Sequence, residues 1–372
     1  VWDWDEQWKV EWIQDGVPMG EMERFTDIDP DYERSLVAEV ERYHAKGDLD
    51  YKYGTYRTAL PAHFMFACVP DPYAKVIEVV VTDRFGRVFR EKIVLEAVDV
   101  QAHRGGMGLM PENTIEAMLN AVRLGVNTLE LDLQISKDGQ VLVSHDPYMN
   151  YNFVTKPDGS FITKEDTKKY FLYNMTYDSI VKYDTGTKFF EAFPQQQKIA
   201  TSKPLLNDLI DAVEKFTAEN GYTPVNYNIE IKSHAGHEKN GLVPEYREFT
   251  DKAMAVLHQK GLGSRLIIQT FDVRGLNYLN EKYPGFVLSY LVGMKDTDFE
   301  ANMAKLDFVP QWYSPHHSLV NESSLALWHE AGLKVVPWTV DDPAEIERLV
   351  NLKVDAIIGN YPDRILKITR KY

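Results

Sequence analysis

The chain has 372 residues, of which 44% are hydrophobic and 26% are charged, a composition typical of globular proteins. Its formal net charge of −15 argues against general binding to nucleic acid or to anionic membranes, because both need a basic surface. No apolar run approaches the roughly 20 residues of a membrane-spanning helix, and the single cysteine, Cys68, excludes an internal disulfide and a cysteine-based metal site.

Residues 1–98 differ in pattern from the rest of the chain. Residues 8–12 and 75–81 have the alternation typical of strands, and a turn after the second stretch leads into a further strand that ends near Leu95. One helix is expected in the acidic stretch 31–43. The pattern predicts a small antiparallel β-sandwich module.

From residue 99 onward, strands alternate with helices. Residues 114–124 carry apolar side chains at helical spacing and stop at Gly125, and Asp342-Pro343 is a typical helix start. Nine strand signals occur in this part: 98–103, 128–134, 141–145, 225–232, 265–271, 287–291, 307–312, 334–340 and 356–358. The alternation predicts an α/β fold with a parallel sheet, and residues 99–372 have the length of a (βα)8 TIM barrel.

A barrel of this kind needs eight strands, so one strand signal is in excess. Only Lys137–Gly139 separates the second signal from the third, and a connection that short joins only antiparallel strands. One of the two is therefore predicted to be a hairpin arm above the barrel. Folding back, the arm brings His145 beside Glu130 and Asp132.

Four polar clusters end predicted strands, where barrel enzymes place their catalytic groups. They are His103-Arg104-Gly105, Glu130-Leu131-Asp132, His145-Asp146 and Glu230-Ile231-Lys232. The i, i+2 spacing directs the side chains of a pair to one face of the strand. Converging carboxylates repel each other unless a hard divalent cation offsets them, and oxygen ligands favour Mg or Ca over Zn. Two imidazoles suit acid–base work near neutral pH, and Arg104 and Lys232 supply positive charge for a phosphate.

Each cluster taken alone has a plain structural explanation. The Glu-x-Asp pair fits a polar rim, His103 a hydrogen-bonded core histidine, and His145-Asp146 a turn. All four nevertheless fall in succession at the same end of the predicted barrel, and this joint occurrence indicates an active site.

These motifs resemble the signature of the glycerophosphodiester phosphodiesterase family. The likeness covers roughly residues 99–365 and includes His103–Gly105, Pro111–Thr114, Glu130–Asp132, His145-Asp146, 228–232, 268–271 and 338–340. It implies a (βα)8 barrel that hydrolyses glycerophosphodiesters to glycerol 3-phosphate and an alcohol. It also implies the following roles: His103 and His145 as the catalytic acid–base pair, Glu130, Asp132 and Glu230 as ligands of a divalent cation, Mg or Ca, and Arg104, Lys232, Gln269, Phe271 and Trp338 as substrate-binding residues, with Trp338 on the glycerol side.

Two features depart from the family pattern. Asn360 stands where the family commonly has Asp before its Tyr-Pro, a position expected to be structural. An insertion at about 147–204 is rich in Tyr and Phe, and in the family the insertion at this place covers the barrel mouth. Its aromatic side chains are expected to pack the insertion against the barrel; the alternative is a choline-binding cage built on cation–π contacts.

The N-terminal module has a looser likeness of its own. Residues 1–5 and 81–86 resemble a β-sandwich module at the C-terminal end of secreted bacterial calcineurin-like phosphoesterases. The chain also starts at Val1 rather than Met. A periplasmic or secreted bacterial protein is therefore expected, with the cytoplasm as the alternative.

Two rival functions stay open beside hydrolysis of a small phosphodiester. One is a phospholipase-type phosphodiesterase that acts on a lysophospholipid or sphingomyelin, which an apolar groove beside the barrel mouth would favour. The other is a non-catalytic surface binding protein in which residues 1–98 engage a partner. Loss of a catalytic His or of a carboxylate ligand would favour the binding protein, and the sequence has lost neither.

Overall fold

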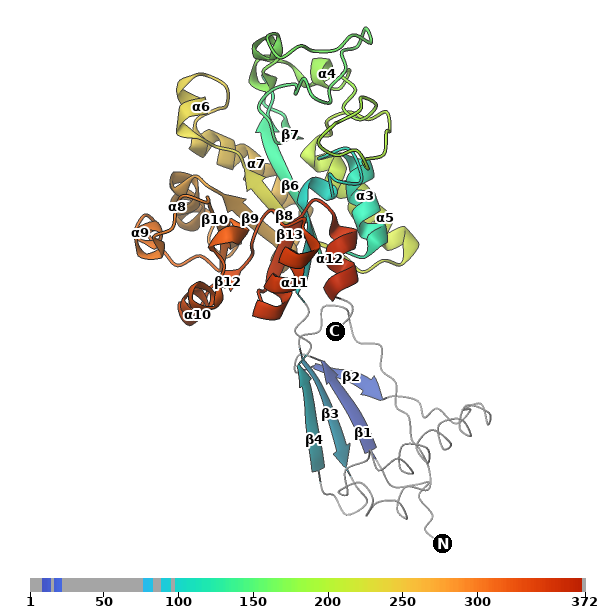
Figure 1. The fold of residues 1–372 in the computed structure, drawn as a ribbon, viewed down its shortest axis with the longest axis vertical. Coiled ribbons are helices and arrows are strands. Elements are labelled where there is room, and N and C mark those ends of the chain that lie inside the picture. Colours follow the sequence, from blue (N-terminus) through green and yellow to red (C-terminus); the bar gives the residue numbers. More distant parts are fainter. Residues whose placement is uncertain (1–8, 15–16, 22–75, 83–87, 95–97, 370–372) are drawn as a thin grey trace, which may run out of the picture. The chain divides into compact units, whose positions relative to one another are not determined.

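The chain divides into two compact units, Val1–Ala97 and Val98–Tyr372. The structure, a computed structural model, describes residues 9–14, 17–21, 76–82, 88–94 and 98–369 (Figure 1). No helix among these residues is both long enough and apolar enough to cross a membrane.

The described part of the first unit is one antiparallel sheet. Its strands are β1 (Lys9–Gln14), β2 (Val17–Glu21), β3 (Val76–Thr82) and β4 (Val88–Val94), in the order β2-β1-β3-β4. Strands β1, β3 and β4 occupy the stretches that the alternation predicted, and β3 pairs with β4 in an antiparallel register along its whole length. The predicted helix at 31–43 and any second sheet of a sandwich lie outside the described residues.

The second unit is a barrel of eight parallel strands. The strands are β5 (Asp99–Ala102), β6 (Thr128–Ile135), β8 (Asn226–Ile231), β9 (Leu266–Thr270), β10 (Val287–Val292), β11 (Trp312–Pro315), β12 (Lys334–Val335) and β13 (Ala356–Gly359). They pair in the order β12-β11-β10-β9-β8-β6-β5-β13. Backbone hydrogen bonds from Ile358 to the Pro337 carbonyl, 3.0 Å, and from Val340 to the Ile358 carbonyl, 2.9 Å, link the two ends of this sheet. The predicted TIM barrel is confirmed.

The ninth strand signal is a hairpin arm, as expected from the short connection. Strand β7 (Val141–Val143) pairs antiparallel with β6, with Val143 opposite Leu133, and it lies off the path of the barrel strands. The arm therefore folds back along β6, and it brings His145 back over the barrel.

Two strand boundaries differ from the prediction, and prolines explain both. The signal at 307–312 predicted a strand that the structure places later, as β11, after Pro310 and after Val309, which is 62% exposed. Strand β12 ends at Val335, whereas the signal ran on to 340 through Pro337. Because proline has no backbone N–H to donate to a ladder, both prolines lie beside a strand and not within it.

Most helices of the second unit cover the outside of the barrel, whereas the short helix Tyr177–Ile180 belongs to the insertion that follows β7 (Figure 1). The helices of this unit are α3 (Ile115–Leu124), α4 (Tyr177–Ile180), α5 (Leu206–Asn220), α6 (Ala235–Lys239), α7 (Tyr246–Lys260), α8 (Val273–Lys282), α9 (Phe299–Met303), α10 (Glu322–Glu330), α11 (Pro343–Leu352) and α12 (Pro362–Thr369). The Thr114 side chain caps the start of α3, Gly125 ends it in a left-handed conformation, and Asp342 caps α11. The two helix starts expected from the sequence are therefore confirmed.

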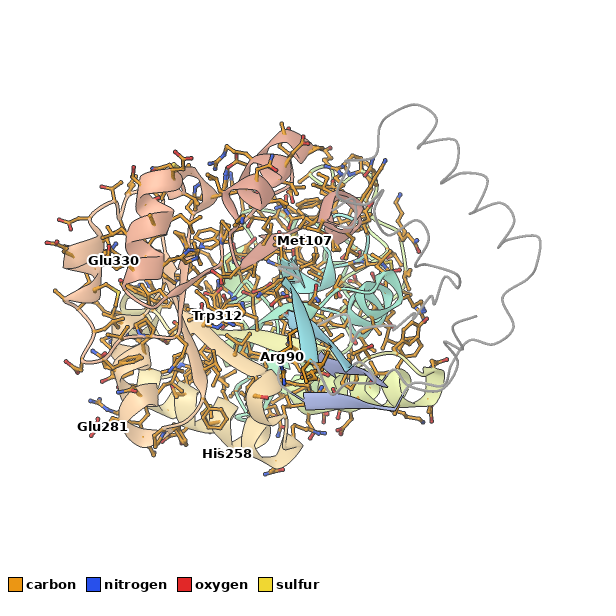
Figure 2. The ribbon with its side chains drawn as sticks, turned by 90° about the horizontal axis from the view of Figure 1, so that it is seen from below. Arg90, Met107, His258, Glu281, Trp312 and Glu330 are labelled. Carbon is orange, nitrogen blue, oxygen red and sulfur yellow. The ribbon has the colours of Figure 1, made fainter. Side chains whose placement is uncertain are left out.

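The barrel interior is layered because side chains alternate along a strand. A cluster of buried apolar residues lies inside the barrel, with Trp312 labelled in Figure 2: Ile267, Trp312, Val336, Ala356 and Ile358. Two residues further along β9, Gln269 shares the inward face with Ile267. Asn228 Nδ2 donates to Gln101 Oε1 at 2.8 Å and to Gln269 Oε1 at 3.1 Å. These three amides thus form one hydrogen-bonded layer inside the barrel.

The insertion between β7 and α5 has a small core of its own. Its buried members are Met149, Phe153, Val154, Ile162, Leu172 and Ile180, together with Leu142 of β7. Several of its Tyr and Phe side chains, including Tyr170, Tyr183 and Phe190, pack against this cluster. The aromatic content therefore serves to pack the insertion, which supports the first of the two interpretations from the sequence.

Candidate active site

Three carboxylates converge where β6 and β8 end. Glu130 and Asp132 lie on β6, Glu230 lies on the adjacent β8, and the parallel register pairs Asp132 with Glu230. One oxygen from each side chain lies within 4.8 Å of the others, and all three residues are buried. The convergence predicted from the i, i+2 spacing on two strands is present.

Two cations lie against this triad. Lys232 Nζ is 3.0 Å from Glu230 Oε1 and 3.5 Å from Asp132 Oδ1. Arg104 Nε is 3.5 Å from Asp132 Oδ2, and its Nη1 is 3.2 Å from Glu112 Oε2. With Glu130 included, four carboxylates face two cations, which leaves a formal charge of −2 when every group is ionised. A divalent cation would offset this charge.

The ionisation of the three carboxyls reflects this shortage of positive charge. Burial, followed by repulsion from Asp132, raises the pKa of Glu130 well above its ordinary value. Burial also raises the pKa of Glu230, although Lys232 opposes the shift. Burial alone would raise the pKa of Asp132 too, but the positive charges around it, Lys232 first, hold that pKa below its ordinary value. Either protons or a cation must therefore share the site, and an all-oxygen donor set fits a hard divalent cation.

A tight turn directs His103 and Arg104 toward these carboxylates. Arg104 adopts a left-handed backbone conformation with φ of 51°, and its N–H donates to Glu130 Oε2 at 2.8 Å. Gly105 follows with φ of 80°, and a Cβ on it would lie 2.8 Å from the Cβ of Ala117 in α3. Only glycine fits there, so the chain can turn away from the site directly after presenting both side chains.

His103 is held by a residue from the far end of the chain. Its Nδ1 lies 2.5 Å from Asn360 Oδ1, directly after β13. Burial, followed by the charge of Arg104, lowers the pKa of His103 to about 3. The imidazole is therefore neutral near neutral pH. Asn360, expected from the sequence to be structural, is in direct contact with a candidate catalytic residue.

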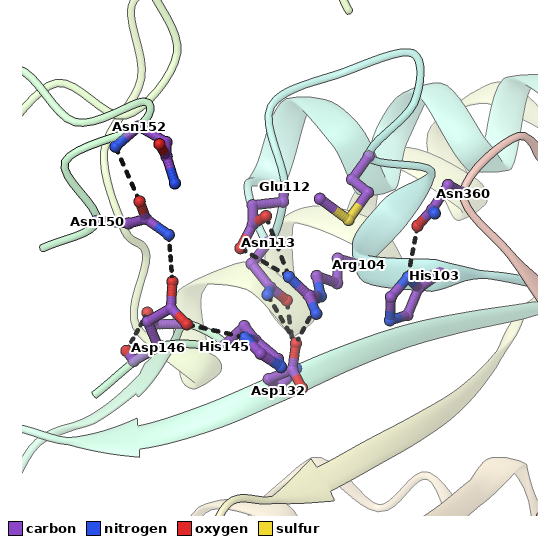
Figure 3. A network of polar contacts seen from close by, with 12 residues as sticks. His103, Arg104, Glu112, Asn113, Asp132, His145, Asp146, Asn150, Asn152 and Asn360 are labelled. Carbon is purple, nitrogen blue, oxygen red and sulfur yellow. Dashed lines mark hydrogen bonds and ion pairs between the residues drawn. The ribbon is translucent and has the colours of Figure 1, made fainter. Parts of the chain in front are cut away.

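His145 is held by its neighbour in the sequence. Its Nδ1 lies 3.0 Å from Asp146 Oδ1, and Asp146 Oδ2 accepts from Asn150 Nδ2 at 2.6 Å. Burial raises the pKa of Asp146, but the hydrogen bond and charge of His145 outweigh burial and bring that pKa to about 2. Figure 3 shows His103 and His145 on either side of Arg104 and Asp132.

These groups share one pocket with a polar and an apolar side. The polar lining residues are His103, Arg104, Glu130, His145, Glu230, Lys232 and Gln269, and the others are Phe271, Leu291, Trp338, Thr339 and Ile358. The rings of Phe271 and Trp338 meet edge to face, 5.4 Å apart. Of the ten site residues expected from the sequence, nine line this pocket, and Asp132 lies behind it in contact with both cations. No lining residue belongs to the fully described insertion 147–204, so the structure gives no support to a choline cage there.

Two neighbours of the triad had no role assigned from the sequence. Asn113 Nδ2 donates to Asp132 Oδ2 at 2.9 Å, and Asn113 Oδ1 accepts from the Asp132 N–H at 3.2 Å. Glu112 holds the Arg104 guanidinium. Both lie in the stretch Pro111–Thr114, which belonged to the family signature without a stated function. Their burial in a loop, where polar residues are usually exposed, marks them as part of the site.

Comparisons with known proteins agree with this geometry. The chain is 27% identical over 283 residues to a glycerophosphodiester phosphodiesterase of Bacillus subtilis, covering 73% of this chain and 86% of that protein. It is 31% identical over 289 residues to lysophospholipase D GDPD1 of Rattus norvegicus, covering 71% and 83%. An Oleispira antarctica phosphodiesterase, solved in complex with the product sn-glycerol-3-phosphate, shares the fold with a TM-score of 0.58 at 22% identity, covering 73% of this chain and 96% of that one.

Family models match both parts of the chain. Residues 1–89 match the C terminal of Calcineurin-like phosphoesterase, the module that the N-terminal segments resemble. Residues 103–364 match the Glycerophosphoryl diester phosphodiesterase family, and this match spans most of the chain. The chain therefore belongs to the glycerophosphoryl diester phosphodiesterase family, a family of phosphoric diester hydrolases.

Proposed function

We propose that this protein hydrolyses glycerophosphodiesters to glycerol 3-phosphate and an alcohol, with a divalent cation, Mg or Ca, as cofactor. The observation that carries the proposal is one pocket with its supporting carboxylate: two carboxylates, two cations and two histidines line it together with Phe271 and Trp338, and Asp132 completes the carboxylate triad from behind. The named relatives and the product bound to the Oleispira antarctica enzyme support the same substrate class.

Glu130, Asp132 and Glu230 would hold the cation. Their oxygen ligands, burial and net negative surroundings fit Mg or Ca better than a softer metal. Bound there, the cation supplies Lewis-acid polarisation of a phosphoryl oxygen.

Arg104 and Lys232 bind the phosphate in this proposal. Arg104 keeps its charge, since Glu112 and Asp132 raise its pKa against the effect of burial. Lys232 Nζ pairs with Glu230 and Asp132. Once a cation offsets these carboxylates, the ammonium group is available to a phosphate oxygen. The two side chains then place positive charge where negative charge develops in the transition state.

The two histidines differ in the proton that each can handle. His103 is neutral and contacts an uncharged amide, so it accepts the proton of the attacking hydroxyl. His145 contacts the carboxylate of Asp146 through Nδ1, so in this proposal it is the group that gives a proton to the leaving alcohol oxygen. The attacking hydroxyl belongs either to water or to the glycerol of the substrate, and the second route passes through a cyclic phosphate.

The apolar wall binds the carbon skeleton of the glycerol. Trp338 and Phe271 form an aromatic corner of the pocket, and Trp338 Nε1 donates to the Ser314 carbonyl at 2.8 Å, which fixes the indole plane. Gln269 Nε2 donates to Glu130 Oε1 at 2.9 Å, so this amide orients a cation ligand while it lines the pocket.

A lysophospholipid is the second candidate substrate. Phe271 is 43% exposed beside the pocket, so an acyl chain has apolar surface on which to rest, and one relative is named as a lysophospholipase D. The headgroup chemistry would be the same for both substrates.

One assay decides between these substrates. The enzyme is given a panel of glycerophosphodiesters and lysophospholipids, with Mg, with Ca or with a chelator, and released glycerol 3-phosphate or lysophosphatidate is quantified. Cation-dependent release of glycerol 3-phosphate is expected. Release of lysophosphatidate alone would move the proposal to the second substrate, and turnover of neither class would overturn it. A cyclic glycerol phosphate in single-turnover samples would identify the glycerol hydroxyl as the attacker.

A further inference from the structure

The contact between His103 and Asn360 does not by itself determine which ring nitrogen of His103 carries the hydrogen. The distance of 2.5 Å joins an imidazole nitrogen to an amide oxygen, and the donor depends on which tautomer the ring adopts. A neutral imidazole that carries its hydrogen on Nδ1 has its lone pair on Nε2, and the other tautomer has the reverse. Only one of the two presents a proton acceptor away from Asn360.

Asp341 answers this question because it fixes the orientation of the amide. One carboxylate oxygen of Asp341 accepts from the Asn360 backbone N–H at 2.8 Å, and the other lies 2.6 Å from Asn360 Nδ2. An ionised carboxylate only accepts hydrogen bonds, so the amide nitrogen must face Asp341 and the amide oxygen must face His103. The nitrogen of His103 that meets this oxygen is then a donor.

We infer that Asp341 and Asn360 are positioning residues that hold His103 as the Nδ1–H tautomer, with Nε2 carrying the lone pair that accepts the proton in the proposed reaction. Within the described part of the chain, Nε2 of His103 has no hydrogen-bond partner, and the ring lines the pocket. The catalytic half of this inference rests on the proposed function. The tautomer itself follows from the contacts alone.

The backbone hydrogen bonds that close the barrel hold Asp341, Asn360 and His103 in fixed positions relative to one another. Asp341 follows Val340, whose N–H donates to the Ile358 carbonyl, and Asn360 follows β13 by one position. Between them, a Cβ on Gly359 would lie 2.5 Å from the Val340 carbonyl oxygen, so only glycine permits this approach. Asp342, the next residue, is committed to capping α11. The pair therefore lies on fixed backbone at the point where the sheet closes.

The two histidines consequently receive different partners. His145 has a carboxylate directly on Nδ1, whereas His103 has an amide there, and the charge of Asp341 is one hydrogen bond further away. An amide orients the ring without placing a full negative charge against it. His103 is thus suited to start the reaction neutral.

The test reads the tautomer without relying on turnover. The full chain is labelled with 15N-histidine, and long-range 1H–15N correlation spectra distinguish a protonated ring nitrogen from a bare one. The signals of His103 are assigned from their loss in His103→Gln. The wild type is expected to show a protonated Nδ1 and a bare Nε2 at His103. A bare Nδ1 in the wild type would overturn the inference whatever the variants do.

Asp341→Asn removes the constraint on the amide, because an amide can face Asn360 with either end. Mixed tautomers at His103 are expected, with kcat about 2- to 10-fold lower and KM within about twofold, since only the fraction of molecules with the Nδ1–H tautomer can accept the proton. Asn360→Ala removes the partner of Nδ1, so its spectrum should show the same mixture of tautomers at His103 as that of Asp341→Asn. Asp342→Asn is the matched control: it keeps the helix cap, and it should match the wild type in both readouts.

Each result has a distinct meaning. Asp341→Asn with the wild-type tautomer at His103 would refute the role of the carboxylate. A changed tautomer with unchanged kcat would refute the catalytic half. If the wild type hydrolyses no phosphodiester, the proposed function fails, while the spectra still decide the tautomer.

Discussion

Cation binding should depend on pH, because protons and the cation compete for the same carboxylates. The perturbation is removal of the divalent cation with a chelator, compared with saturating Mg or Ca, at a series of pH values. Burial raises the pKa of both Glu130 and Glu230, so the cation-free protein retains protons there above the ordinary glutamate value of 4.5. Cation binding should release these protons and become tighter as the pH rises.

The sign of the stability change follows from the same shifts. A carboxyl whose pKa is raised in the folded state makes the cation-free fold less stable as the pH rises from 4.5 through the raised value. Asp132, with a lowered pKa, acts in the opposite sense, but its stabilising effect is lost only below its ordinary value of 3.8. From about pH 5 upward the glutamates dominate, so the stability difference between cation-bound and cation-free protein should widen.

The magnitude comes from mass action. A cation at about 100 times its Kd stabilises the fold by about 2.7 kcal/mol, which for a barrel of this size raises Tm by about 5 °C. Scanning calorimetry at pH 5, 6, 7 and 8 measures the difference in Tm, and titration calorimetry in buffers of different ionisation enthalpy counts the protons released. Glu130→Gln should abolish most of the difference, and Glu219→Gln, which alters an exposed residue of α5, should leave it intact. A difference in Tm that is the same at every pH, with no proton release, would refute the reasoning.

Three further predictions concern turnover. His103→Ala and His145→Ala should each lower kcat by about 10²–10⁴-fold with Tm within a few degrees of wild type, whereas His234→Ala, outside the pocket, should be unchanged in stopped assays of glycerol 3-phosphate release. Trp338→Ala should raise KM more than it lowers kcat, because the apolar wall contacts ground state and transition state alike; a loss confined to kcat in steady-state kinetics would contradict that role. A chain that begins at Val98 should keep wild-type kcat with soluble substrates, and loss of activity in a folded truncated chain would show that the N-terminal module contributes to catalysis.

The sequence alone predicted those parts of the site that depend on the side-chain period of a single strand. The i, i+2 spacing of Glu130 and Asp132 needs only the two-residue period of a strand to place both side chains on one face. The excess strand signal was resolved by the length of its connection, and β7 is the hairpin arm that this length required. Local geometry of this kind depends only on residues that are close in the sequence, so it can be predicted without knowledge of the fold.

Contacts across the barrel could not be predicted in this way. Asn113 meets Asp132 nineteen positions away, and Asn360 meets His103 from the other end of the barrel. Each is a polar residue in a loop, and its partner is set by which strands become neighbours when the sheet closes. The early end of β12 and the late start of β11 have the same origin, because the alternation of side chains ignores whether a proline can join the ladder.

The position of the two histidines in the fold explains why their partners differ. His103 follows a barrel strand next to the closing seam, so residues from the last strand and the segment before α11 reach it, and an amide backed by a carboxylate can be placed there. His145 follows the hairpin strand β7, which pairs with β6 and contacts the segment Pro204-Leu205. Its partner comes from its own loop, where Asn150 fixes Asp146. Substitutions in the insertion can therefore change the position of His145 through Asp146. The amide that holds His103, in contrast, belongs to the barrel. The contacts of His145 therefore depend on the insertion, whereas those of His103 depend on the closure of the sheet.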